Sequence, residues 1–204
     1  MESAGKLRFL NHNVFHAVEA DGSLFSGGPG AVTAYGIPKA IANAMMLIPL
    51  IGQECYACGP GWFVTGNQDK SEIQVIMYHY EHYNLNLHLD VVLPREEQMK
   101  IDRYIGFENH GAREVRIMLQ GVKPGKWKRE DFCIDREYGS SYDIWYRTGT
   151  PKRLTPNMIQ RLVHISEPGL YYEEVHVRAD RSLQLSLILE PLSVRLIQLK
   201  RDEA

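Results

Sequence analysis

The first residues in the sequence whose spacing could support chemistry are two cysteines, Cys55 and Cys58, separated by two residues. A redox pair with this spacing normally opens a helix, whose dipole lowers the pKa of the thiol. Here Gly59-Pro60-Gly61 follows and prevents that helix. A structural zinc ion would need two further ligands at similar spacing, and Cys133 stands alone. We therefore expect incidental cysteines of a loop or strand, no metal site and no cofactor.

A second group of residues gathers histidines, tyrosines and one glutamate between positions 78 and 88. On a strand, His79 and Glu81 share one face and His82 points to the other, so the histidines do not converge as metal ligands. Aromatic rings offer flat apolar area with a polar tip, which suits contact with a sugar or with another sheet. The alternative is an ordinary half-buried sheet surface. The candidate substrate-binding residues in this segment are Tyr78, Tyr80 and Tyr83.

The sequence contains two pairs of adjacent carboxylates, Glu96-Glu97 and Glu173-Glu174. The question is whether either could be the catalytic pair of a glycoside hydrolase. That chemistry needs two carboxyl groups across one sugar, about 5 Å apart in retaining enzymes. Sequence neighbours point to opposite faces of a strand and diverge by about 100° on a helix, so we expect both pairs on the solvated surface. Residues 26–30 are rich in glycine but lack the Lys-Ser/Thr of a phosphate loop, and there is no G-x-S-x-G elbow. No catalytic residue is assigned.

The composition is that of an ordinary globular protein of 204 residues with a net charge of −2, enough for one large domain or two small ones. The sequence pI of 6.4 gives no reason to expect contact with nucleic acid or an anionic membrane. The longest apolar stretch, residues 37–51, is interrupted by Pro38, Lys39 and Pro49 and is too short to span a bilayer. Three cysteines fit a reducing compartment, so we expect a cytoplasmic protein without a secretion signal.

Apolar spacing predicts one helix in the first quarter of the chain. Gly36 and Pro38 indicate a turn into a helix with Pro38 in its first turn, and Pro49 and Gly52 end it. Upstream, residues 7–10 have the pattern of a short strand, followed by a long glycine-rich loop. The apolar face of the helix follows helical intervals: Ile37, Ile41, Ala44, Met45 and Ile48.

After residue 60 the hydrophobic period changes to two, which is typical of half-buried strands. Between Leu196 and Ile197 the alternation changes phase, which indicates either a bulge or a strand buried on both faces. Thr155 and Pro156, as N-cap and first residue, begin the one later helix that we expect, over residues 155–164. The short runs predict an antiparallel sandwich: residues 72–83, 114–120, 127–134, 171–178, 183–189 and 192–200.

Several segments, taken in order, resemble glycoside hydrolase family 39, the β-xylosidase family. Residues 24–33 and the following Tyr35-Gly36-Ile37-Pro38-Lys39 are similar to the last barrel loop and helix of that family. The segment Asp102-Arg103-Tyr104 and the end of the chain resemble the family-39-like regions fused behind DNA-binding domains in AraC-type regulators. Further segments resemble the strands and C-terminal β-sandwich of family 39: residues 62–65, 73–83, 139–145, 166–168 and 189–197.

This resemblance implies a mainly β fold, an antiparallel β-sandwich preceded by a strand-loop-helix remnant of a (β/α)8 barrel. It places the last unit of the barrel in residues 1–53 and the sandwich in residues 54–204. The acid/base and nucleophile of the family are glutamates at the ends of earlier barrel strands, so they would precede Met1 and are missing from this chain. The eighth barrel strand would contribute residues to the sugar cleft: Phe9, Asn11, His12 and Asn13.

Departures from the family pattern point away from catalysis. Phe9-Leu10 and Val14-Phe15 stand where active members carry Tyr-Trp and a following Ser-Asp near the sugar. Ser26 replaces a histidine before Gly-Gly. Even a complete barrel, formed by this chain with the other barrel units, is therefore expected to be a poor catalyst.

Three functional hypotheses remain open. The first is a non-catalytic C-terminal module of a β-xylosidase-like protein, whose partner is the rest of the glycosidase barrel or a second copy of the chain; it predicts an exposed apolar surface on residues 7–52. The second is a sugar-sensing or assembly region of an AraC-type transcriptional regulator. The third is a free-standing carbohydrate-binding module that holds a xylo-oligosaccharide on its tyrosines.

Overall fold

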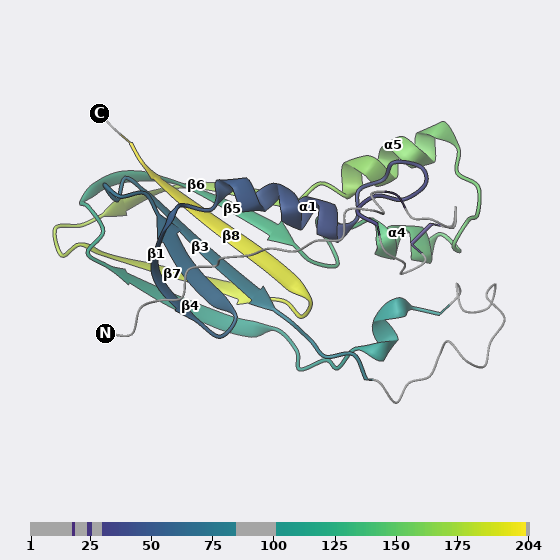
Figure 1. The fold of residues 1–204 in the computed structure, drawn as a ribbon, viewed down its shortest axis with the longest axis horizontal. Helices are drawn as coiled ribbons and strands as arrows, with labels where there is room; N and C mark the ends of the chain where they lie inside the picture. Colours follow the sequence, from purple (N-terminus) through teal and green to yellow (C-terminus); the bar gives the residue numbers. More distant parts are fainter. Residues whose placement is uncertain (1–17, 19–23, 26–29, 85–100, 203–204) are drawn as a thin grey trace.

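The computed structural model describes residues 18, 24–25, 30–84 and 101–202. In this part of the chain, a six-stranded sheet packs against a two-stranded sheet, and a helix lies on the other face of the larger sheet (Figure 1). Each pair of neighbouring strands is antiparallel. The predicted mainly β sandwich is therefore confirmed. The predicted strand at residues 7–10 lies outside the described residues.

The larger sheet has the order β1-β2-β3-β8-β5-β6, and β4 pairs with β7 in the smaller sheet. Each of the six predicted strand segments contains a strand, although the one predicted for residues 72–83 ends at His79. The larger sheet also has β1 and β2 at one edge, joined by a tight turn at Pro60-Gly61. The strands are β1 Glu54–Gly59, β2 Trp62–Gly66, β3 Glu72–His79, β4 Arg113–Gln120, β5 Gly125–Ile134, β6 Gly169–Val177, β7 Ser182–Leu189 and β8 Ser193–Arg201.

The phase change in β8 comes from burial on both faces. The pairing of β8 with β3 and with β5 runs without a register shift, which excludes a bulge. Ile197 and Leu199 face the smaller sheet and join the main core around Trp127, whereas Leu196 faces the helix side. Neighbouring residues of a strand point to opposite faces, so a strand covered on both sides has apolar residues at consecutive positions.

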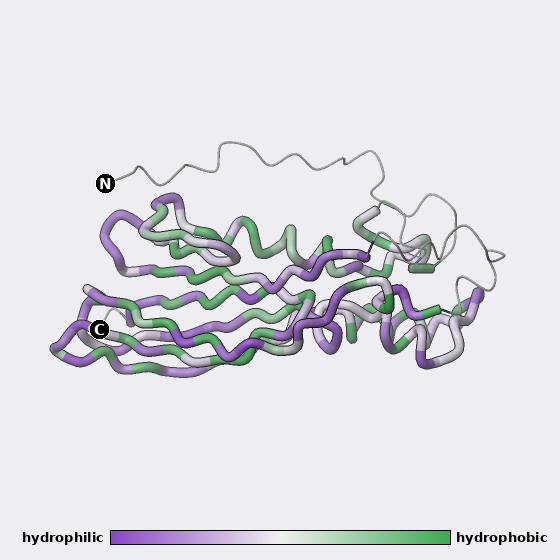
Figure 2. The backbone as a smooth tube through the Cα atoms, turned by 90° about the horizontal axis from the view of Figure 1, so that it is seen from below, coloured by the Kyte–Doolittle hydropathy of each residue, from purple (hydrophilic) through white to green (hydrophobic). Residues whose placement is uncertain are grey.

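The main core lies between the two sheets. Trp127 and Val177 of the larger sheet and Leu185 of β7 belong to it, and each of them is at most 3 % exposed. Figure 2 shows the two layers edge-on, with hydrophobic and hydrophilic segments alternating along their strands. This alternation is the pattern expected of sheets that bury one face against each other.

Helix α1, Ala40–Leu47, continued by a 3₁₀ turn at Ile48–Leu50, covers the other face of the larger sheet. The sequence predicted the wrong face and an earlier start: Asn43 and Leu47 are buried, whereas Ile41 is 42 % and Ile48 40 % exposed. The amide of Asn43 explains the rotation, because it donates to the carbonyls of Gly139 and Ser166 at 2.9 and 2.5 Å and fixes that side against the protein.

A second cluster of aromatic side chains lies beside the sandwich and includes residues of the segment 139–145, which carries part of the family resemblance. Residues Tyr142–Arg147 form helix α4, so the expectation of a single later helix was wrong. Trp145 and Tyr142 pack against Phe25 and Ile37, which precedes α1 instead of belonging to it. A 3₁₀ turn at Arg103–Gly106 lies nearby, since the Tyr104 ring is 5.3 Å from that of Tyr142.

Helix α5, Pro156–Ile165, begins as the sequence predicted. Thr155 is the N-cap and its hydroxyl accepts from the Met158 amide at 3.3 Å, with Pro156 as first residue. None of the helices in the described ranges is long and apolar enough to cross a bilayer.

A buried ion-pair network joins three strands of the larger sheet. Asp131 on β5 is 1 % exposed at its side chain and accepts from Arg129 at 3.0 Å and from Arg195 on β8 at 3.1 and 3.0 Å. Arg129 also reaches Glu173 on β6 at 3.0 Å. One carboxylate thus holds two guanidinium groups that water screens poorly.

Removing that carboxylate tests the network. We expect Asp131→Ala to lower the free energy of unfolding by about 3 kcal/mol, because it leaves two partly buried arginines without a counter-charge. The control is Glu114→Ala, which breaks an exposed pair with Arg116 and is expected to cost less than about 1 kcal/mol. Urea denaturation of both variants measures the difference, and equal losses would contradict the role of burial.

Candidate functional site

The predicted sugar-binding residues fall into two groups. Phe9, Asn11, His12 and Asn13 lie outside the described residues, so their predicted role stays a prediction. Tyr78, Tyr80 and Tyr83 are exposed, as a binding surface requires.

The three tyrosines have different neighbours. Tyr83 packs edge-on against Phe107 at 5.2 Å, and its ring lies where a Cβ of Gly106 would be. The ring of Tyr80 meets that of His82 at 5.0 Å. Of the three, Tyr78 lines a groove.

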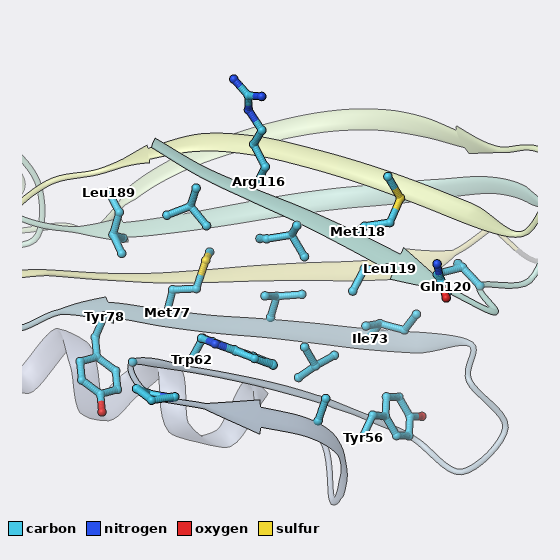
Figure 3. Close-up of a pocket in the computed structure, with 18 of the residues that line it drawn as sticks. Tyr56, Trp62, Ile73, Met77, Tyr78, Arg116, Met118, Leu119, Gln120 and Leu189 are labelled. Carbon is cyan, nitrogen blue, oxygen red and sulfur yellow. The ribbon is translucent and has the colours of Figure 1, made fainter. Parts of the chain in front are cut away.

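This groove, here called the β4 groove, lies between β4 and the β1–β2–β3 end of the larger sheet (Figure 3). It has a volume of about 650 Å³. Val64, Val75 and Met77 line it from the larger sheet, and Val115 and Ile117 line it from β4. The groove is therefore a continuation of the sandwich core that opens to solvent beside β4.

Two exposed aromatic rings on the β1–β2 hairpin border the β4 groove. Trp62 is 40 % exposed, and its indole occupies the space where Gly59 would carry a Cβ. Tyr56 lies in the same way over Gly66, and its hydroxyl donates to the carbonyl of Asn67. The missing side chains of two glycines thus allow both rings to lie close against the hairpin.

A buried carboxylate with two histidines marks the end of β3. His79 and Glu81 meet, as the strand spacing predicted: Nε2 of His79 lies 3.0 Å from Oε1 of Glu81, and both side chains are at most 1 % exposed. The second partner, His110, comes from a distant segment, and its Nδ1 lies 2.6 Å from Oε2 of Glu81. No spacing rule connects positions 81 and 110, so no pattern in the sequence predicts this contact.

Each member of the Glu81–His110 pair shifts the titration of the other. The hydrogen bond from His110 holds the pKa of Glu81 below its ordinary value, against the opposing effect of desolvation. The hydrogen bond to Glu81 raises the pKa of His110. With Glu108 these residues could offer three metal-ligand atoms within 4.8 Å of one another, but Nδ1 of His110 already contacts Glu81, and the arrangement is that of an ion pair.

The cysteines of the C-x-x-C motif lie on β1 and are exposed, and all three cysteines are free thiols. Burial and the neighbouring Cys58 raise the pKa of Cys55. A redox-active thiol needs the opposite shift. The structure therefore gives no support for a redox centre in this motif.

Two segments that carry the family resemblance are joined by one arginine. Arg136 pairs with Asp143 in α4 and lies 3.3 Å from Asp102, and its guanidinium stacks 4.1 Å above the Tyr104 ring. Asp102 in turn accepts from the Tyr104 amide at 3.0 Å. No motif in the sequence pointed to Arg136, whose contacts link the two segments structurally.

The pH dependence of stability tests the Glu81–His110 pair. A lowered carboxyl pKa stabilises the fold above the ordinary value of 4.5, and a raised histidine pKa stabilises it below the ordinary value of 6.5. The loss of stability in His110→Gln should therefore be largest between these pH values and shrink on either side.

The urea midpoints of wild type and variant, measured from about pH 4 to about pH 9, give this difference over a range that spans the titration of both groups. His164→Gln is the control, because His164 and its partner Glu167 are both exposed. A pH-independent effect of His110→Gln would show that the contact is not an ion pair.

Comparison with known proteins gives similarity in both sequence and fold. No family model matches the chain. An uncharacterized HTH-type transcriptional regulator of Staphylococcus aureus strain COL is 22 % identical over 138 residues, which are 68 % of this chain and 16 % of that protein. The corresponding regulator of strain MRSA252 is 23 % identical over the same length. The chain therefore spans less than a fifth of these curated relatives.

Solved glycosidases have the same fold over most of the chain. A monomeric β-xylosidase from Caulobacter crescentus CB15 matches with a TM-score of 0.71 and 20 % identity, over 89 % of this chain and 34 % of its own. The family 39 glycoside hydrolase of Xanthomonas axonopodis pv. citri matches with a TM-score of 0.68 and 13 % identity, over 86 % and 33 %. The chain thus has the fold of part of a family 39 glycoside hydrolase and a distant sequence likeness to HTH-type regulators, as the sequence resemblance implied.

Proposed function

We propose that this chain is a non-catalytic β-sandwich module of a family-39-like protein, and that the larger protein is a helix-turn-helix transcriptional regulator. The likeness of fold to family 39 enzymes supports the first part, and the sequence likeness to HTH-type regulators supports the second. In this proposal, residues 1–53 are the last unit of a barrel whose other units belong to the longer polypeptide. Residues 54–204 are the sandwich that packs beside it.

The observation that carries this proposal is the outer face of α1. The chain has no charged residue between Lys39 and Glu54, and Asn43 is the one polar residue of α1, so the rest of the helix circumference is apolar. One side of it is buried on the larger sheet, whereas Ile41, Met46 and Ile48 are 42, 69 and 40 % exposed. A helix that is apolar all round is normally buried on all sides, so the outer face is where a partner packs.

The module would give the regulator a docking and assembly surface without chemistry of its own. The buried carboxylates Glu81, Asp131 and Asp143 each have a cationic or histidine partner. A glycosidase pair needs one carboxylic acid and one free carboxylate across a sugar. We expect this chain to release no nitrophenol from an aryl β-xyloside above the blank, and release by clean protein would contradict the proposal.

Substitution on α1 tests the docking face. We expect the double change Ile41→Asp and Ile48→Asp to leave the unfolding free energy of the 204-residue chain within about 1 kcal/mol of wild type, because both side chains are already exposed. The same change should abolish binding to the remaining barrel units, expressed as a separate polypeptide. Analytical ultracentrifugation of the mixture measures this binding.

The matched control is Ile188→Asp, an equally apolar residue that is 57 % exposed on β7. Binding that survives the α1 change, or that is lost equally with Ile188→Asp, would contradict a role for α1. The DNA upstream of Met1 gives an independent check: the proposal requires in-frame coding sequence for the other barrel units and a helix-turn-helix, and an adjacent stop codon would overturn it.

A further inference from the structure

The two layers of the sandwich differ in width. The larger sheet has six strands and the smaller has two, and in the described part of the chain β4 has one partner strand, β7. Beyond the other edge of β4 lies the β4 groove, whose opposite wall is built from β2 and β1. An edge strand offers a row of main-chain donors and acceptors to any extended chain that reaches it.

The side chains in the β4 groove have the chemistry of an incomplete core. Val64, Val75 and Met77 are at most 8 % exposed, but Val115 and Ile117 on β4 are only partly buried. In Figure 3, Arg116 points away from the larger sheet. Branched aliphatic side chains along both walls suit an inserted strand with apolar side chains better than they suit a sugar.

The charged residues that line the β4 groove are all basic. Lys70, Arg113 and Arg116 are among its lining residues, and none of the described lining residues is acidic. Lys70 lies 5.7 Å above the Tyr56 ring, and Arg116 is paired with Glu114 at 2.8 Å, which leaves Arg113 and Lys70 to attract an anion. An acidic partner is therefore favoured.

We propose that the β4 groove binds an extended segment of the longer polypeptide, with alternating apolar and acidic side chains, as an added strand beside β4. The apolar side chains would face Val64 and Met77, and the acidic ones would face solvent near Arg113 and Lys70. This proposal rests on the chain being a module of a larger protein. A second copy pairing antiparallel through β4 is the competing occupant, and the sedimentation measurement below distinguishes the two.

Trp62 provides the readout. Trp127 and Trp145 are 0 and 2 % exposed, so a change in tryptophan emission on docking reports Trp62, at 40 % exposed. The probe is a capped peptide of about eight residues that alternates valine and glutamate, since a strand of this length matches β4. We expect a saturable blue shift that weakens at high salt and at least a tenfold weaker response to the valine–lysine peptide.

Two further arms separate strand addition from simple apolar contact. In an added strand, alternate residues point their N–H groups toward β4, so only one series, the valines or the glutamates, donates to it. N-methylation of that series should abolish binding, and N-methylation of the other series should not. The double change Lys70→Glu and Arg113→Glu affects exposed side chains and should reverse the preference toward the valine–lysine peptide. Arg153→Glu with Arg161→Glu is the matched control, because it makes the same charge change at exposed residues that do not line the groove, and it should leave binding unchanged.

Several results would overturn the inference. They are no emission change with either peptide, equal tolerance of both N-methylated series, or a Trp62 response to xylo-oligosaccharide at millimolar concentration. Self-association that shields Trp62 before any peptide is added, detected by sedimentation, would assign the groove to a second copy instead. The peptide is supplied separately, so its binding does not depend on the α1 docking face. A failure of peptide binding would therefore not contradict the proposed function, which the α1 variants test independently.

Discussion

The structure depends on the need to cover both faces of the larger sheet. β8 lies in the middle of that sheet, and its residues Leu196, Ile197 and Leu199 are at most 1 % exposed although they point to different sides. The smaller sheet covers one side and α1 covers the other. Without α1 the apolar side chains of Ile76, Ile134 and Leu196 would face water, so the helix is an integral part of the sandwich.

One amide fixes where that covering helix sits. Asn43 donates to the backbone of Gly139 and of Ser166, and it is 3 % exposed. Both carbonyls belong to segments that carry the resemblance to family 39. Arg136 makes a second link of this kind, between Asp102 and α4. The segments are thus joined by polar contacts, and those of Asn43 are buried, where a polar group without its partner is costly. These contacts bring segments that are distant in the sequence together in the fold.

The buried polar side chains hold the fold together, whereas exposed apolar side chains remain available for contacts. Asp131, Asp143 and Glu81 are buried and paired, and they stabilise contacts between segments distant in sequence. Two of the exposed apolar surfaces differ in kind. The outer face of α1 is a helix surface suited to a packed partner, whereas the β4 groove is a strand edge suited to an extended one. These are the two surfaces on which docking is proposed.

The strands could be predicted from the sequence because a period of two is local information. Val115, Ile117 and Leu119 recur at every second position regardless of what lies opposite them, and the helix at Pro156 carries its own cap in Thr155. The alternation also showed that β8 was unusual, but only the sheet order resolved this as burial on both faces.

Sequence alone thus determined the strand positions, the capped helix and the likeness to family 39, because each rests on residues close together in the chain. Tertiary structure decided the face of α1, the partner of Glu81 and the β4 groove. Apart from Asn43, α1 is apolar on every side, so the spacing of its apolar residues did not indicate which side the sheet would cover. Asn43 fixes that side through hydrogen bonds to two distant carbonyls. His110 and the groove likewise depend on contacts between distant segments, and such contacts exist only once the chain has folded.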